Sequence, residues 1–140
     1  MAERPSPNMR LQVAERAKGV CEYCRAPDSF ASDVFETEHV IPRIRGGITE
    51  LENLAWACGG CNLFKGAKHE GPDPDSREMA PIFNPRHDSW EEHFVWSEDF
   101  LRIIGISASG RATVEVLRMN RISVMNLRRA LLAVGQHPPI

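Results

Sequence analysis

Four polar side chains near the middle of the chain together offer the chemistry of phosphodiester hydrolysis: Glu38, His39, Asn53 and Asn62. A neutral imidazole such as that of His39 can take a proton from water near pH 7. Carboxylate and amide oxygens suit hard divalent cations such as Mg²⁺ or Mn²⁺, which stabilise the pentacoordinate phosphorus and the leaving oxygen. Only one carboxylate belongs to this set, so the pattern favours a site with one catalytic metal over a site with two.

The four cysteines of the chain form two Cys-x-x-Cys pairs, Cys21 with Cys24 and Cys58 with Cys61. In a cytosolic chain such pairs favour a metal over disulfides. Four thiolates close a tetrahedral Zn²⁺ shell with no vacant position, which is typical of structural zinc. The pairs are 33 residues apart, a gap that a two-stranded unit fits. Buried free cysteines and a redox pair are the alternatives, and two well-spaced pairs favour zinc over both.

The segments that carry these residues predict the order strand, loop, strand, helix. Residues 34–41 are rich in β-branched and apolar side chains and predict a strand that ends before Pro42. Residues 54–57 predict a second, short strand. A short helix should follow the second cysteine pair and continue through Lys65.

Strand geometry sets a condition on the candidate site. Neighbouring residues of a strand face opposite sides. Glu38 and His39 can therefore serve one site only if the strand bends or ends beside them. Pro42 and the glycine-containing loop after it make such an ending reasonable.

The rest of the chain predicts elements that support this unit. These are a helix from 7 to about 18, an irregular connector over 66–89, one or two strands within 90–106, and helices over about 111–120 and 122–134. We therefore expect a zinc-stapled core over 1–70, a connector over 71–89, and a C-terminal strand-and-helix extension over 90–140 that packs on the core.

Between about residues 21 and 66, the order Glu-His-Val-Ile-Pro, Gly-Gly, Asn-Leu and Cys-x-x-Cys-Asn-x-x-Lys resembles the HNH endonuclease family. A looser resemblance, to an extension in some small bacterial HNH proteins, follows from Phe83 to Trp96. The family resemblance implies an α+β fold with a ββα-metal (HNH) core stapled by a four-cysteine zinc site. It also implies a metal-dependent endonuclease that hydrolyses DNA phosphodiester bonds.

The resemblance implies a role for each matching position. His39 matches the general base, and Asn53 matches the residue that orients this histidine and its loop. Glu38 and Asn62 match the positions that hold the catalytic Mg²⁺ or Mn²⁺, where Asp and His are common. Because asparagine binds a metal more weakly than histidine, weak Mg²⁺ affinity is expected. Lys65 matches a position that contacts phosphate.

Arginines are the expected contacts to DNA. The formal net charge is −2, but residues 1–99 carry 11 basic and 18 acidic side chains, whereas residues 100–140 carry 6 basic and 1 acidic. Such asymmetry can mark a surface for an anionic polymer, and a solvated helix face is the alternative. Arg43 and Arg45 should grip phosphates beside the scissile bond. The C-terminal arginines expected to contact DNA are Arg118, Arg121 and Arg128.

The sequence also predicts the setting in which the protein acts. No apolar run approaches the length of a membrane span, and the polar start over 1–5 does not have the pattern of a secretory signal. We expect a cytoplasmic monomer or homodimer that acts on double-stranded DNA and has no membrane partner. The main alternative is a non-catalytic zinc-stabilised DNA-binding module, and a protein-interaction zinc module is a third. The catalytic set favours the enzyme, because a module that only binds needs no such set.

Overall fold

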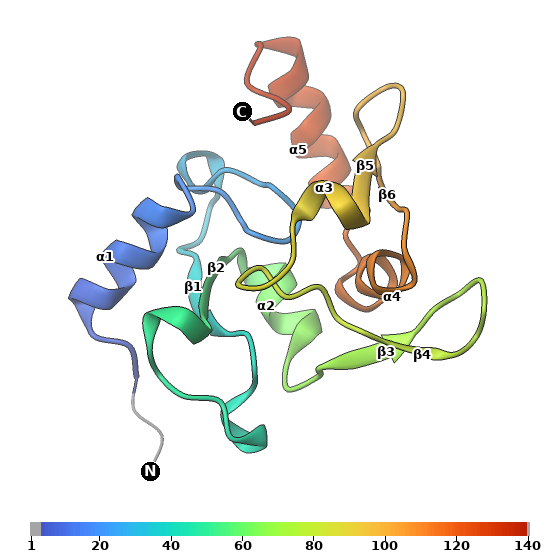
Figure 1. Ribbon diagram of the computed structural model, residues 1–140. Coiled ribbons are helices and arrows are strands. Elements are labelled where there is room, and N and C mark those ends of the chain that lie inside the picture. Colours follow the sequence, from blue (N-terminus) through green and yellow to red (C-terminus); the bar gives the residue numbers. More distant parts are fainter. Residues whose placement is uncertain (1–3, 140) are drawn as a thin grey trace.

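The centre of the molecule is a two-stranded antiparallel sheet followed by a short helix (Figure 1). The computed structural model describes residues 4–139. Strands β1 (Glu36–His39) and β2 (Leu54–Ala57) pair, and helix α2 (Gly59–Lys65) follows β2 directly. Every residue of β2 is buried. The α+β class and the strand, loop, strand, helix order are confirmed.

The other elements surround this unit. In chain order they are α1 (Pro7–Arg16), β3 (Glu70–Pro72), β4 (Met79–Pro81), α3 (Trp90–His93), β5 (Phe94–Trp96), β6 (Ile103–Gly105), α4 (Ala108–Leu117) and α5 (Ile122–Ala133). Short 3-10 turns lie at Asp28–Phe30, Arg43–Arg45 and Leu51–Asn53. Within the described residues, no helix combines the length and the apolar character that crossing a membrane requires.

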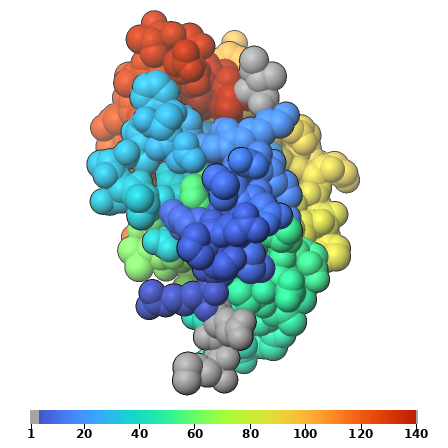
Figure 2. Space-filling view, turned by 90° about the vertical axis from the view of Figure 1, so that its left-hand side faces the viewer, coloured from blue at the N-terminus to red at the C-terminus, as the bar shows by residue number. Residues whose placement is uncertain are grey.

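Helix α1 is exposed on the face of the molecule that Figure 2 shows, and it packs against strand β2. The Ser6 side chain caps it by accepting a hydrogen bond from the Met9 amide at 3.1 Å, and Pro7 occupies the first turn. The helix ends two residues before the predicted end, because Lys18 and Gly19 both adopt the left-handed conformation. Val13 is its fully buried residue.

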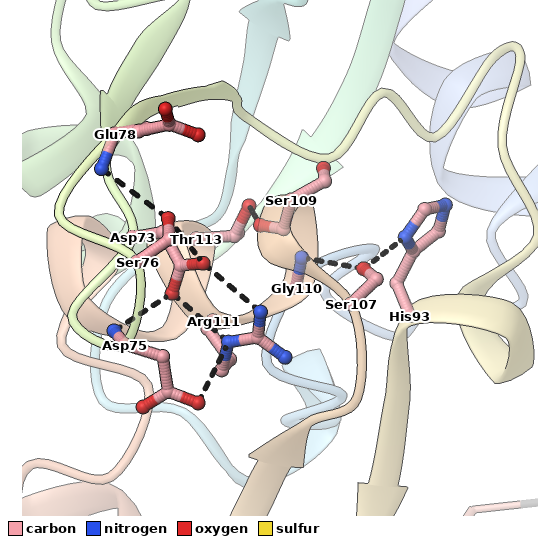
Figure 3. A network of polar contacts seen from close by, with 10 residues as sticks. All are labelled: Asp73, Asp75, Ser76, Glu78, His93, Ser107, Ser109, Gly110, Arg111 and Thr113. Carbon is pink, nitrogen blue, oxygen red and sulfur yellow. Dashed lines mark hydrogen bonds and ion pairs between the residues drawn. The ribbon is translucent and has the colours of Figure 1, made fainter.

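The segment expected to be an irregular connector instead contains the hairpin β3–β4. Asp73 is fully buried between the strands and accepts two 2.9 Å hydrogen bonds from Arg111 of α4 (Figure 3). Gly71 allows this close packing, because a β-carbon there would lie 2.4 Å from the Val116 side chain. The sequence did not predict this hairpin, because the many Gly, Pro and Asp residues of the segment are typical of loops.

The C-terminal segment differs from its prediction in two places: at residues 90–93 and at the first residue of α4. Residues 90–93 form the short helix α3, and strands β5 and β6 follow it. Helix α4 begins at Ala108, with Ser107 as its cap, so Gly110 lies inside the helix and not before it. A β-carbon at Gly110 would lie 2.0 Å from the His93 carbonyl oxygen. Glycine is therefore required at this position by packing and does not mark the helix start.

Candidate active site and metal centre

The four cysteine thiols form one buried cluster. Their sulfur atoms all lie within 4.8 Å of one another, and the Sγ atoms of Cys24 and Cys58 are 3.6 Å apart. A tetrahedral zinc with Zn–S bonds of about 2.3 Å would separate its sulfurs by roughly 3.8 Å. The donor set and its spacing are therefore compatible with structural zinc. Since Cys58 also caps α2, the cluster fixes the start of that helix against the first cysteine pair.

Arg121 contacts this cluster. Its guanidinium donates to Cys58 Sγ at 3.3 Å and to Cys61 Sγ at 3.9 Å. Gly60 makes room for it, because a β-carbon there would lie 2.4 Å from the guanidinium. The positive charge of Arg121 offsets negative charge on the cysteine sulfurs. Because the guanidinium is directed at these sulfurs, the predicted contact of Arg121 with DNA phosphate does not fit its position.

Arg128 is buried, with 3% of its surface exposed. Its guanidinium donates to the carbonyl oxygens of Leu101 at 2.9 Å and Met119 at 2.7 Å, and it lies over the Trp96 ring. The prediction that Arg128 contacts DNA is therefore wrong: the group is held inside the fold. Arg118 is exposed over the Phe64 ring, and its contact with DNA stays a prediction.

The candidate catalytic residues meet at a pocket of about 790 Å³. Glu38, His39 and Asn62 all line it, and Arg43 lines it as well. Strand β1 ends at His39, which meets the condition that the strand must end for neighbouring residues to serve one site. Asn62 is half-buried in the first turns of α2, directly after the last cysteine of the cluster.

His39 is positioned by a residue that the sequence analysis missed. Its Nε2 lies 2.9 Å from Thr49 Oγ1. Burial lowers the pKa of His39, and the positive charges of Arg43 and Lys65 lower it further. The imidazole is therefore neutral at pH 7, as a general base requires. The sequence signal for Thr49 is only its place two residues after the paired glycines.

Asn53 is buried and holds the loop between the strands. Its Oδ1 accepts from the Ile41 amide at 2.9 Å, and its Nδ2 donates to the carbonyl oxygens of Ile41 at 3.1 Å and Ile48 at 2.8 Å. Gly47 allows the loop to close, because a β-carbon there would lie 1.7 Å from the Ile41 oxygen. Asn53 thus shapes the loop that carries Thr49, and Thr49 contacts the imidazole.

Glu38 and Lys65 form a buried ion pair. Glu38 Oε2 accepts from Lys65 Nζ at 2.7 Å, Glu38 Oε1 accepts from the Tyr23 hydroxyl, and the two charged side chains are only 4% and 1% exposed. Lys65 also donates to the Val40 carbonyl oxygen at 2.9 Å. This geometry contradicts the prediction that Lys65 contacts phosphate, because its ammonium group is enclosed by protein partners.

The ion pair bears on whether a divalent cation fits. Burial raises the pKa of Glu38, while Lys65 and Tyr23 oppose that rise. Each carboxylate oxygen has a second acceptor position besides its hydrogen bond, and the Asn62 amide lines the same pocket. The donors therefore suit Mg²⁺ or Mn²⁺. Lys65 cancels the charge of Glu38, so the donor set attracts a cation weakly.

Further arginines border the pocket. Arg45, on the loop after β1, donates to the Ala67 carbonyl oxygen at 3.1 Å, and Ala67 lines the pocket. Arg4 and Arg10 also line it, from the N-terminal segment. The sequence did not indicate these two, because the position of α1 and of the residues just before it relative to the pocket was not predictable.

The comparisons with known proteins identify the central part of this architecture. Residues 21–68 match a family model described as HNH endonuclease. No curated protein matches the chain. The matched segment contains both cysteine pairs, β1, β2 and α2, and a match of this kind indicates a nuclease or DNA-binding class of protein. The match over residues 21–68 agrees with the HNH resemblance carried by the Glu-His-Val-Ile-Pro and Cys-x-x-Cys motifs.

Proposed function

We propose that this protein is a metal-dependent endonuclease that hydrolyses DNA phosphodiester bonds in the pocket lined by Glu38, His39 and Asn62. One observation carries the proposal: a neutral, half-buried imidazole shares a pocket with a carboxylate and an amide, within a segment of the HNH type. Double-stranded DNA is the proposed substrate. The four-cysteine cluster is proposed to bind one structural zinc.

His39 is the proposed general base. In the tautomer whose Nε2–H donates to Thr49 Oγ1, Nδ1 carries the lone pair that accepts a proton from the attacking water. The hydrogen bond to Thr49 holds the ring in this orientation. Attack on the side opposite the leaving 3′-oxygen gives products with 5′-phosphate and 3′-hydroxyl ends.

Glu38 and Asn62 are the proposed holders of Mg²⁺ or Mn²⁺. When bound, this cation supplies Lewis-acid stabilisation of charge on the phosphate and on the leaving oxygen. Tyr23 and Lys65 fix the Glu38 carboxylate from behind, and Lys65 favours its ionised form. Arg43 adds positive charge on the pocket wall, where it favours the approach of a phosphate.

A plasmid-nicking assay tests the proposal. Wild-type protein should nick supercoiled plasmid in the presence of Mg²⁺ or Mn²⁺. A chelator that leaves zinc bound should stop cleavage, and added Mg²⁺ or Mn²⁺ should restore it. His39→Ala should slow cleavage by at least roughly 10²-fold while DNA binding persists. A His39→Ala protein that cuts at the wild-type rate would show that the base lies elsewhere.

The non-catalytic DNA-binding module remains the second candidate, because one observation favours it. Both Glu38 oxygens are already occupied by Lys65 and Tyr23, as expected where a carboxylate has a structural role. A wild-type protein that shifts duplex DNA in a gel but cuts no substrate with any divalent cation would decide for this candidate. Cleavage that depends on added divalent metal would decide for the enzyme.

A further inference from the structure

The pocket has an outer wall that lies outside the HNH-type segment. Arg4, just before α1, and Arg10, inside α1, line the same pocket as His39. The HNH match begins at residue 21, so these two arginines lie outside the matched segment. Figure 2 shows the N-terminal helix exposed across this face of the molecule.

Arg10 is anchored relative to the catalytic strand. Its Nη2 donates to the carbonyl oxygen of Phe35, the residue directly before β1, and its guanidinium lies 4.8 Å from the centre of the Trp56 ring. A guanidinium has five N–H donors in a planar fork. One donor reaches Phe35, so donors on the same rigid group remain for an anion in the pocket.

The charge around the pocket is positive. The basic side chains that line it are Arg4, Arg10 and Arg43, and the acidic ones are Glu36 and Glu38. Lys65 forms a buried ion pair with Glu38 and so neutralises its charge. Among the described residues that line the pocket, the basic side chains therefore outnumber the acidic ones once the Lys65–Glu38 pair is counted as neutral. A pocket wall of this sign attracts a polyanion.

We propose that Arg4 and Arg10 bind backbone phosphates of duplex DNA beside the scissile bond, and so form a second phosphate-binding wall of the pocket that Arg43 also lines. The inference rests on the proposed function, because it takes DNA as the polymer in the pocket. It concerns binding only, and it assigns no step of the reaction to either arginine. The contacts are to phosphate, so they position the duplex without reading its sequence.

The test measures DNA affinity as a function of salt for Arg4→Gln, Arg10→Gln and a matched control, Arg129→Gln. Arg129 is exposed on α5, contacts Asn126 and does not line the pocket, so its loss removes the same charge elsewhere. Fluorescence anisotropy with a short duplex, without added Mg²⁺ or Mn²⁺, keeps the substrate intact. The slope of log K against log[NaCl] should flatten by about 0.9 for each lost phosphate contact.

The expected result is a flatter slope and weaker binding for both pocket variants, with Arg129→Gln equal to wild type. Arg4→Gln is the decisive variant for folding reasons, since Arg4 is exposed, whereas Arg10 contacts Phe35 and Trp56. Slopes and affinities for both pocket variants that equal those of Arg129→Gln would overturn the inference. An effect on single-stranded DNA or an RNA hairpin but not on the duplex would also overturn it.

The outcomes separate this inference from the proposed activity. A wild-type protein that never cuts DNA, but whose pocket variants show the flatter slope, would contradict the nuclease proposal and support the phosphate wall. A protein that nicks DNA in a His39-dependent way, but whose pocket variants bind like wild type, would support the nuclease and contradict the wall.

Discussion

The arginines at the two ends of the chain differ in what their guanidinium groups contact. Arg10, near the N-terminus, lines the candidate active-site pocket. Arg111, Arg121 and Arg128, in the basic C-terminal segment, contact a buried carboxylate, cysteine sulfurs and buried carbonyl oxygens. Three of the six arginines in the more basic segment therefore serve the fold. The partner of each guanidinium, and not the charge balance of a segment, therefore indicates which arginines are available to bind phosphate.

The C-terminal arginines have a structural use that explains their burial. Arg128 joins carbonyl oxygens from residues 101 and 119 and comes within 3.4 Å of the Cys24 carbonyl oxygen. A guanidinium can satisfy several such acceptors at once. Burial lowers the pKa of Arg128 to about 10, so the side chain keeps its charge at neutral pH. The C-terminal helix is thereby attached to the first cysteine pair.

The largest expected loss of stability comes from a change in the four-cysteine cluster that Arg121 contacts. Cys61→Ser removes one of four metal ligands, so the protein should lose its zinc and its cooperative thermal unfolding, since structural zinc supplies folding free energy. Elemental analysis should find about one zinc per wild-type chain and much less in the variant, and circular dichroism should follow the melting. A freshly purified wild-type protein without bound metal would contradict the zinc assignment.

A smaller loss of stability should follow from Arg128→Met. The change leaves several buried carbonyl oxygens without a donor, and the free energy of unfolding should fall by about 3 kcal/mol. Urea denaturation measures it, with Arg129→Met as the exposed control. The salt dependence of DNA binding should stay that of wild type under conditions where the variant is folded. An unchanged free energy of unfolding together with a flatter salt slope would show that Arg128 contacts DNA and does not stabilise the fold.

The central unit was predictable because its signals are local. The cysteine spacing, the β-branched run before Pro42 and the Asn-Leu start of the second strand lie within short stretches. They predicted β2 over residues 54–57 and the end of α2 at Lys65, as the structure has them. The meeting of these side chains could be anticipated for the same reason, since residues 38 and 39 end β1 and residue 62 directly follows the last cysteine.

The remaining features depend on partners far away in the sequence. Lys65 was expected to contact phosphate, but its ammonium group contacts Glu38, 27 residues earlier. Arg128 reaches Cys24 across 104 residues. The hairpin β3–β4 is stabilised by Arg111 contacting Asp73, 38 residues before it. Such pairings follow from tertiary packing, and no local pattern of residue types predicts them.

Arg43 offers a test of how the pocket charges act on the base. Because Arg43 lowers the pKa of His39, Arg43→Gln should raise it. Cleavage by a neutral base rises with pH through its pKa, so the wild-type rise should lie below the ordinary histidine value of about 6.5, and the variant's rise should move to higher pH. The pH dependence of nicking at saturating metal measures both, with Arg129→Gln as control. A shift to lower pH, or none, would contradict this assignment.

The smallest effect is expected from Arg118→Gln. Arg118 is exposed over the Phe64 ring, so the stability change should stay within about 0.5 kcal/mol. Its predicted phosphate contact should flatten the salt slope of duplex binding by at most about 0.9. The same anisotropy titration used for the pocket variants measures it. A larger change in the salt slope than Arg4→Gln causes would indicate that the C-terminal segment makes the main contact with DNA.

The most direct test of the central claim is the nicking rate of supercoiled plasmid by His39→Ala compared with wild type, at equal zinc content and with added Mg²⁺ or Mn²⁺. We expect metal-dependent nicking by wild type, ends that carry 5′-phosphate and 3′-hydroxyl, and a rate at least roughly 10²-fold lower for the variant at unchanged DNA affinity. Equal rates for the two proteins, or no cleavage by wild type with any divalent cation, would contradict it.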